Sequence, residues 1–190
     1  MYKKGDGQVK LVLLDRDGVL NADRPDYVKN ASEFRMLPGA AEAVAKLSKR
    51  GFHVAVVSNQ AGVGKMLISE ESLWQISSLL ELAVESAGGA IERFYYCKHT
   101  PEDNCNCRKP RPGLILQACK DMGVKPSDCY FVGDAERDVL AARSSGCKSV
   151  LVLTGFTRRE DVEKFEQKPD YVANDLREAA DWIIGRENAD

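Results

Sequence analysis

The sequence lacks a long hydrophobic run. Near its start, the apolar stretch Leu11–Leu14 ends at the charge of Asp15. A membrane-spanning helix needs roughly 20 apolar residues, and the apolar core of a signal peptide needs about 7–15. The sequence therefore predicts neither a membrane span nor a signal peptide, and we expect a cytoplasmic protein that does not bind membranes.

An excess of charge of one sign is also lacking. The chain has 27 Lys and Arg residues against 29 Asp and Glu residues, which gives a net charge of −2. Proteins that bind nucleic acids or anionic membranes broadly do so through clustered positive charge. This balance argues against a nucleic-acid partner, and it leaves room only for a local basic pocket.

Internal repeats, low-complexity tracts and Gly/Ser-rich linkers are absent from the sequence as well. At 190 residues, with 44% hydrophobic and 29% charged residues, the composition is that of a globular protein. We therefore expect a single domain that spans residues 1–190 and acts as a monomer.

Short apolar segments alternate with amphipathic segments along the whole chain. The expected strands are Val9–Asp15, His53–Ser58, Arg93–Cys97, Cys129–Val132, Ser149–Leu153 and Tyr171–Val172. The expected helices are Ala40–Lys49, Glu70–Ser86, Gly113–Met122, Glu136–Ser144 and Leu176–Ile184. Because parallel strands need helix-sized connections, this alternation predicts an α/β fold with a doubly wound, mainly parallel sheet. The long segment Asn21–Phe34 after the first strand is an expected functional loop.

Polar side chains stand where several expected strands end. Asp15 and Asp17 follow the first strand, Ser58 ends the second, Asp134 follows the fourth, and Lys109 precedes a helix. The carboxyl ends of parallel strands meet at one edge of the sheet, where ligands bind. Clustered carboxylates repel one another unless a cation relieves the repulsion, so we predict an Mg²⁺ site formed by the side chains of Asp15 and Asp134 and the backbone of Asp17.

The same residues suit phosphoryl transfer. Asp15 is the candidate nucleophile, because carboxylates form aspartyl-phosphate intermediates. Asp17 is the candidate general acid and base, two residues further on. Ser58, Lys109 and backbone N–H groups would hold the transferring oxygens.

Some motifs have simpler interpretations. Gly62-Val63-Gly64-Lys65 lacks the third glycine of a dinucleotide loop and the Ser or Thr of a P-loop, so we predict a turn. Thr157 and Glu160 have the spacing of a helix-capping box. Each short motif at a strand end is also typical of an ordinary turn or helix cap, and only their recurrence at one edge favours a site.

A cysteine cluster follows the third expected strand. Cys97, His99, Cys105 and Cys107 lie within the loop 97–107, and together they form a complete Cys₃His ligand set for structural zinc. Buried or redox-active cysteines are the alternative. Because the loop leads into Arg108 and Lys109, we expect bound zinc to fix the lysine. The remaining cysteines, Cys119, Cys129 and Cys147, are expected to be small core residues.

Four of these segments, taken in order, resemble the motifs of the haloacid dehalogenase-like phosphatases. They are DRDGVLN at 15–21, Ser58, Lys109 and GDAERD at 133–138. The resemblance implies a Rossmann-like fold with Asp15 as nucleophile, Asp17 as general acid/base, Ser58 and Lys109 on the phosphoryl group, and Asp134 on Mg²⁺. It implies that Asp138 orients Lys109 or a metal-bound water.

The zinc loop resembles one branch of that family, which contains the D-glycero-D-manno-heptose 1,7-bisphosphate 7-phosphatases and the histidinol-phosphate phosphatases. The intervals between motifs leave no room for a large cap domain. In family terms Asn59 and Arg108 contact substrate, and the planar fork of Arg108 suits a second phosphate. This favours a phosphorylated sugar, the heptose bisphosphate, over histidinol phosphate. A DNA-end 3′-phosphatase and a non-catalytic zinc-stabilised module are the further alternatives.

Overall fold

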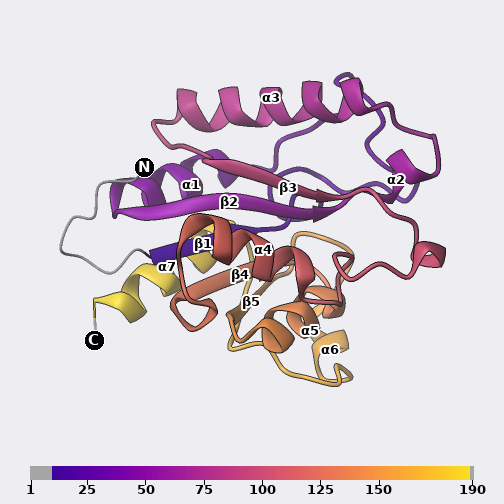
Figure 1. The fold of residues 1–190 in the computed structure, drawn as a ribbon. Coiled ribbons are helices and arrows are strands. Elements are labelled where there is room, and N and C mark those ends of the chain that lie inside the picture. Colours follow the sequence, from indigo (N-terminus) through magenta and orange to yellow (C-terminus); the bar gives the residue numbers. More distant parts are fainter. Residues whose placement is uncertain (1–9, 189–190) are drawn as a thin grey trace.

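The computed structural model describes residues 10–188, which build one six-stranded parallel sheet (Figure 1). The strand order is β3-β2-β1-β4-β5-β6. The strands are β1 (Lys10–Leu14), β2 (Phe52–Asn59), β3 (Arg93–Cys97), β4 (Cys129–Gly133), β5 (Lys148–Val152) and β6 (Tyr171–Ala173). The predicted parallel sheet is thereby confirmed, although Val9, placed in the first strand, lies outside the described residues.

Helices connect the strands and cover both faces of the sheet. They are α1 (Ala40–Lys49), α2 (Ala61–Gly64), α3 (Glu70–Ser86), α4 (Gly113–Met122), α5 (Glu136–Ser145), α6 (Arg159–Val162) and α7 (Leu176–Glu187), with the 3₁₀ turns η1 (Pro101–Asp103) and η2 (Pro126–Asp128). Residues 10–188 contain no helix that is both long and apolar enough to cross a membrane.

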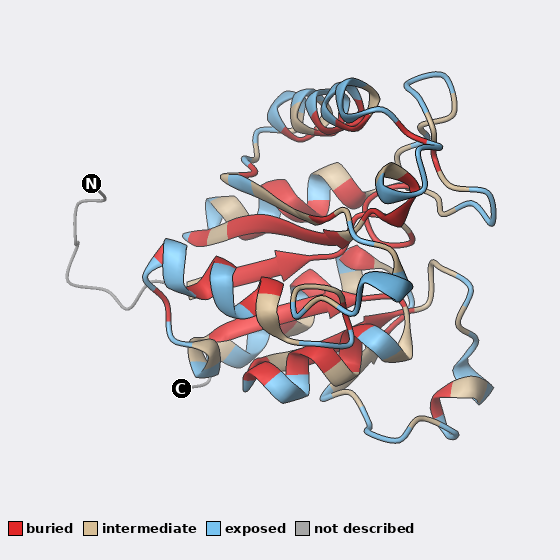
Figure 2. Cartoon of the chain, turned by 45° about the vertical axis from the view of Figure 1, so that its right-hand side comes forward, coloured by how far each residue is buried: buried red, intermediate tan, exposed pale blue. Residues whose placement is uncertain are grey.

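Successive residues of the central strand β1 face the two helical layers. Val12 and Leu14 pack into one hydrophobic cluster with residues of α1, α3 and α7, whereas Leu11 and Leu13 pack into another with residues of α4 and α5. Since neighbouring strand residues point to opposite faces, a strand covered on both sides is apolar throughout. Figure 2 shows the buried residues gathered along the strands. The doubly wound architecture is confirmed.

The order of the strands places a crevice between β1 and β4. From β1 the chain winds outward through β2 to β3, and it then returns to β4 and winds the other way. Ligands bind at such a reversal, beyond the carboxyl ends of the strands. The connections from β1 to α1 and from β2 to β3 hold no separate cap domain within the described chain.

Two local predictions were wrong. Residues Ala61–Gly64 form the short helix α2 instead of a plain turn. The N-cap of α6 is Arg158, one residue beyond the predicted Thr157, and the carboxylate that caps it belongs to Asp161 instead of Glu160. There the Asp161 carboxylate accepts a hydrogen bond from the Arg158 backbone N–H at 3.1 Å.

Candidate active site

Asp15 lies directly after β1, at the carboxyl end of the sheet. Its backbone N–H donates to the Val132 carbonyl of β4 at 2.9 Å, so the neighbouring strand holds it in place. Its Oδ1 atom accepts from the backbone N–H of Arg16 at 2.7 Å, and its Oδ2 atom lies 2.7 Å from Lys109 Nζ. Burial opposes ionisation, but the charge of Lys109 lowers the pKa of Asp15 below its ordinary value. Asp15 is therefore held as a carboxylate.

Lys109 is a fully buried cation between two carboxylates. Its Nζ atom is 2.7 Å from Asp15 Oδ2 and 2.8 Å from Asp138 Oδ1, and it donates to the Val57 carbonyl at 3.1 Å. The Phe131 ring centroid is 4.9 Å from the same atom. Burial acts to lower the pKa of Lys109, but the charges of Asp138 and Asp15 raise it above its ordinary value. The lysine is thus a fixed positive charge beside Asp15.

Asp134 follows β4 and is enclosed by glycines. A Cβ atom on Gly18 would lie 2.5 Å from Asp134 Oδ2, and one on Gly155 would lie 1.8 Å from it. Gly18 also has a φ of +79°, which residues with a side chain rarely adopt. Only glycine therefore lets these two loops close on the carboxylate, and one carboxylate oxygen from each of Asp15, Asp134 and Asp138 lies within 4.8 Å of the other two.

Asp134 is a buried carboxyl whose ionised form a bound cation would stabilise. Burial, followed by the negative charges of Asp138 and Asp15, raises the pKa of Asp134 to about 8. Its Oδ1 atom is buried and accepts no hydrogen bond from the described residues, and the nearest guanidinium, that of Arg137, is 3.8 Å away. Hard oxygen donors with a free lone pair fit Mg²⁺. The Asp17 carbonyl, the predicted third ligand, also accepts no hydrogen bond within residues 10–188.

Asp17 is surrounded by hydrogen-bond donors. Its Oδ1 atom accepts from Arg16 Nε at 3.2 Å and from Asn21 Nδ2 at 2.9 Å. Its Oδ2 atom accepts from Arg16 Nη2 at 2.9 Å and from Gln60 Nε2 at 2.8 Å. Gln60 also donates to Ser58 Oγ at 3.1 Å. The predicted acid/base is therefore oriented by three residues that sequence reasoning did not assign.

A cavity of about 260 Å³ opens above these groups. Its lining comprises Asp15, Asp17, Asp23, Arg24, Pro25, Tyr27, Ser58, Asn59, Ala61, Arg108, Arg137 and Phe156. Four of them belong to the long loop after β1, which was expected to be functional. The cavity brings both predicted catalytic carboxylates together with three guanidinium groups, so it suits an anion with more than one charged group.

The two predicted substrate contacts both line this cavity, but they have different partners. Asn59 uses its amide on the backbone of Lys109: Nδ2 donates to the Lys109 carbonyl and Oδ1 accepts from its N–H, each at 3.1 Å. Arg108 donates only to the His99 carbonyl, at 3.4 Å. Within the described chain Arg108 has no carboxylate partner, and its guanidinium is left for a ligand.

The predicted zinc ligands are brought together beside the active site. Cys97 Sγ lies 3.7 Å from His99 Nδ1, 3.6 Å from Cys105 Sγ and 3.4 Å from Cys107 Sγ. Cys107 Sγ lies 3.2 Å from His99 Nδ1 and 3.4 Å from Cys105 Sγ. A tetrahedral zinc ion would separate its ligand atoms by about 3.5–3.8 Å. The donor set and its spacing therefore fit one zinc ion with no open position.

Two close contacts join the cysteine loop to the active-site wall. Gly113, which begins α4, donates its N–H to the Asn106 carbonyl at 3.1 Å, and a Cβ atom there would lie 2.3 Å from that oxygen. A Cβ atom on Gly64 of α2 would lie 2.5 Å from the Lys98 carbonyl. The loop is thus packed between two helices, and its last ligand is two residues before Lys109.

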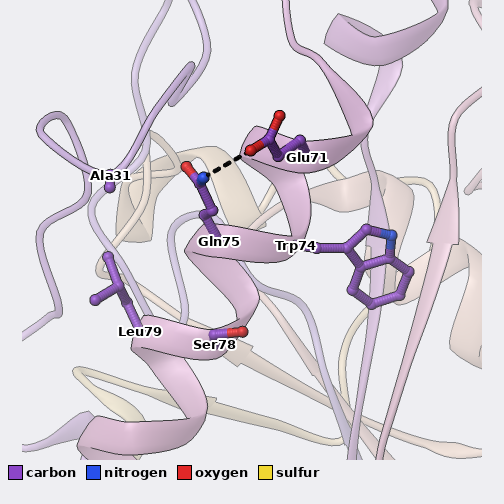
Figure 3. A pocket seen from close by; sticks show the side chains of 6 residues that line it. All are labelled: Ala31, Glu71, Trp74, Gln75, Ser78 and Leu79. Carbon is purple, nitrogen blue, oxygen red and sulfur yellow. Dashed lines mark hydrogen bonds between the residues drawn. The ribbon is translucent and has the colours of Figure 1, made fainter.

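A larger hollow of about 670 Å³ lies on the outer face of α3, away from this site. Figure 3 shows the side chains that line it, where Gln75 Nε2 donates to Glu71 Oε1 at 3.3 Å. The lining contains one carboxylate and no basic group. It does not suit a phosphate.

Comparison with known proteins gives consistent matches over the chain. Residues 106–179 match the family model described as HAD-hydrolase-like. A Neisseria meningitidis serogroup A protein named D-glycero-beta-D-manno-heptose-1,7-bisphosphate 7-phosphatase is 38% identical over 183 residues, which cover 95% of this chain and 97% of the relative. A Pseudomonas aeruginosa protein with the same name is 42% identical over 145 residues, covering 76% and 82%.

Solved structures agree with these matches. The crystal structure of D,D-heptose 1,7-bisphosphate phosphatase from B. bronchiseptica, complexed with magnesium and phosphate, has a TM-score of 0.87 and 33% identity. The alignment covers 94% of this chain and 99% of that one. The corresponding enzyme from Burkholderia thailandensis has a TM-score of 0.67 and 32% identity, with 92% and 98% covered.

Proposed function

This chain belongs to the haloacid dehalogenase-like phosphatases, and from that membership we propose that it removes the 7-phosphate of D-glycero-β-D-manno-heptose 1,7-bisphosphate. The names of the relatives support both the sugar and the β anomer. The observation that carries the substrate choice is the guanidinium of Arg108, which has no carboxylate partner within residues 10–188 and lines the same cavity as Asp15.

Asp15 and Asp134 hold the Mg²⁺ in this proposal, with the Asp17 carbonyl as third protein ligand. Bound magnesium would offset the charge of the carboxylates and of the phosphate, so that an anionic nucleophile can approach an anionic substrate. The raised pKa of Asp134 supports this assignment, as does its Oδ1 atom, which accepts no hydrogen bond from the described residues.

In the first step, an Asp15 oxygen attacks the phosphorus of the 7-phosphate. The bond from phosphorus to the sugar oxygen breaks, and Asp17 gives that oxygen a proton. Lys109 and Ser58 stabilise the charge on the phosphoryl oxygens. For this transfer a protonated Asp17 turns from Arg16 toward the leaving oxygen when substrate binds.

In the second step, water attacks the phosphorus of the aspartyl-phosphate. Asp17 accepts the proton of the water, the bond from phosphorus to Asp15 breaks, and orthophosphate leaves. The observed contacts of Asp17 with Arg16, Asn21 and Gln60 orient its carboxylate beside Asp15 for this role.

Arg108 takes the second phosphate, at C1 of the sugar. Its planar guanidinium can bind a phosphate through two parallel hydrogen bonds. Arg24 also lines the cavity, but it is already paired with Asp26 at 3.1 Å. The amine of histidinol phosphate offers Arg108 a positive charge, which it would repel.

The test is Mg²⁺-dependent phosphate release from both anomers of the heptose bisphosphate and from histidinol phosphate, with Asp15→Asn as the blank. We expect the β-bisphosphate to have the highest kcat/KM. Arg108→Ala should raise the KM for the bisphosphate by about 10–100-fold, in line with the loss of a charged hydrogen-bonded pair. Arg50→Ala, at the far end of α1, is the matched control.

A preference for histidinol phosphate would refute the sugar assignment and leave the nucleophile standing. An Arg108→Ala variant with unchanged KM would show that Arg108 does not bind the second phosphate.

We also propose that residues 97–107 bind zinc and that the enzyme is a cytoplasmic monomer. Metal analysis of the purified protein tests the zinc, and light scattering tests the monomer.

A further inference from the structure

A second group of cysteines lies at the opposite edge of the sheet from the active site. Cys129 is the first residue of β4, Cys119 is in the last turn of α4, and Cys147 immediately precedes β5. Their sulfur atoms all lie within 4.8 Å of one another. Asp134 is five residues along from Cys129, a distance of about 16 Å in an extended strand. This group, the cysteine triad, is therefore separate from the catalytic carboxylates.

The backbone fixes all three positions. Cys129 pairs with Leu11 in the sheet. The Cys119 carbonyl accepts from Val124 N–H at 2.9 Å, and the Cys147 N–H donates to the Ala142 carbonyl at 2.9 Å. Each sulfur thus comes from an element already held by regular hydrogen bonds, so the sulfur atoms converge without help from a ligand.

The surroundings of the triad are apolar and closed. The exposed fractions of Cys119, Cys129 and Cys147 are 2%, 0% and 4%, and all three belong to the hydrophobic cluster under α4 and α5. All three are free thiols. They were expected to be small core residues, and their burial agrees with that. Packing alone, however, does not require three sulfur atoms to meet.

The three sulfur donors of the triad limit which metal ions it can bind. Thiolates favour zinc, iron–sulfur clusters and monovalent copper. Structural zinc takes four ligands, and iron–sulfur clusters take four cysteines. The triad offers three donors within the described chain, in a place with little access for water. A three-coordinate ion with metal–sulfur distances near those of zinc would hold the sulfurs about 4 Å apart, which the observed spacing allows.

We propose that Cys119, Cys129 and Cys147 form a second metal site, which binds one Cu⁺ ion through three sulfur atoms.

The experiment is an anaerobic titration of zinc-loaded protein with Cu⁺, in competition with a chromophoric Cu⁺ chelator. Copper and zinc are then measured in the protein after gel filtration, and X-ray absorption reports the neighbours of the copper. We expect one copper per chain, undiminished zinc, and three sulfur neighbours with no nitrogen. Because the loop 97–107 contains His99, copper bound there would show a nitrogen neighbour.

Variants locate the copper. Cys147→Ala and, independently, Cys119→Ala should lower the affinity for Cu⁺ by at least 100-fold while zinc binding stays unchanged, with circular dichroism as the check on folding. Cys107→Ser is the matched control, and it should keep the copper. Should neither triad variant fold, the wild-type absorption spectrum and zinc content decide the question. Loss of zinc in proportion to copper uptake, a nitrogen neighbour, no retained copper, or unchanged affinity in both folded variants would each overturn the proposal.

Discussion

The carboxylate cluster and the zinc-type loop are both metal-ligand sets at the carboxyl edge of the sheet, but they are assembled in different ways. Asp15, Asp134 and Asp138 come from two segments more than a hundred residues apart, joined because β1 and β4 are neighbours. Cys97, His99, Cys105 and Cys107 come from one stretch of eleven residues.

This difference indicates that the loop 97–107, and not the carboxylate cluster, needs its metal in order to form. The carboxylates are held by strand pairing, by Lys109 and by close-packed glycines, so the fold forms them without an ion. Within the loop 97–107 only Cys97 is buried, and a metal bound by four ligands would organise the rest of the loop. We therefore expect changes in the carboxylate cluster to remove chemistry and changes in the loop to remove order.

The largest effect should come from Asp15→Asn. The amide cannot act as the nucleophile, so kcat/KM should fall by more than about a thousandfold. The fold should persist, because the amide oxygen can still accept from the Arg16 N–H, and Lys109 keeps its contact with Asp138. Steady-state phosphate release together with thermal unfolding checks both statements, and residual activity within tenfold of wild type would exclude Asp15 as the nucleophile.

Asp17→Asn should have the next largest effect. Loss of the general acid/base lowers kcat by about 10²–10⁴-fold. Gln60→Leu removes one hydrogen-bond donor to Asp17 and leaves the carboxyl of Asp17 in place. We therefore expect a smaller decrease in kcat and an altered pH profile of kcat. If the two variants were equally impaired, Gln60 would have a role beyond orienting Asp17.

Zinc removal should act through the loop. Cys107→Ser, or chelation of the wild-type protein, should lower activity by about 10–100-fold, the range seen when the support of a site is lost. Hydrogen exchange should increase at residues 98–112 and stay unchanged in β1 and β4. A zinc-free, folded protein with full activity would contradict the proposed link between loop and lysine.

The smallest effect is a pH dependence of magnesium binding. Because the pKa of Asp134 is raised to about 8, a proton must leave this carboxyl when the metal binds below that pH. The affinity for Mg²⁺ should rise by up to about tenfold per pH unit as the pH approaches 8, and it should level off above 8.

The same raised pKa makes the stability of the metal-free protein depend on pH. A folded pKa above the unfolded value of 3.8 means that the native state binds more protons, so this group's contribution to stability is present at low pH and falls as the pH rises from about 4 to 8. Calorimetry with Mg²⁺ and thermal unfolding without it, each across this range, measure the two effects. Asp134→Asn should abolish both.

The sequence was sufficient to predict the sheet, because every strand is an apolar run and every connection carries a helical pattern. It was also sufficient to place Asp15, Ser58 and Asp134 at the carboxyl edge of the sheet, since a polar residue at the end of a parallel strand has only one edge to occupy.

Sequence reasoning missed Arg16, Gln60 and Arg137. Arg16 and Gln60 are 1% and 2% exposed, which is unusual for such side chains. Their burial depends on contacts with Asp17 that only the folded chain creates, and nothing in the local pattern signals it. Arg137 enters the cavity because α5 starts beside Asp134. The predicted cap of α6 was wrong by one residue, because Asp161 and Glu160 are adjacent carboxylates and Asp161 is the one that accepts from the backbone.

The central claim is that Asp15 carries the phosphoryl group during turnover. Wild-type protein mixed with Mg²⁺ and heptose bisphosphate can be quenched in acid within milliseconds, reduced with borohydride and digested. An aspartyl-phosphate would be converted to homoserine, so mass spectrometry should find homoserine at position 15 only when substrate was present. Unmodified Asp15 under conditions in which a burst of the dephosphorylated sugar is observed, or homoserine at another position, would contradict the account.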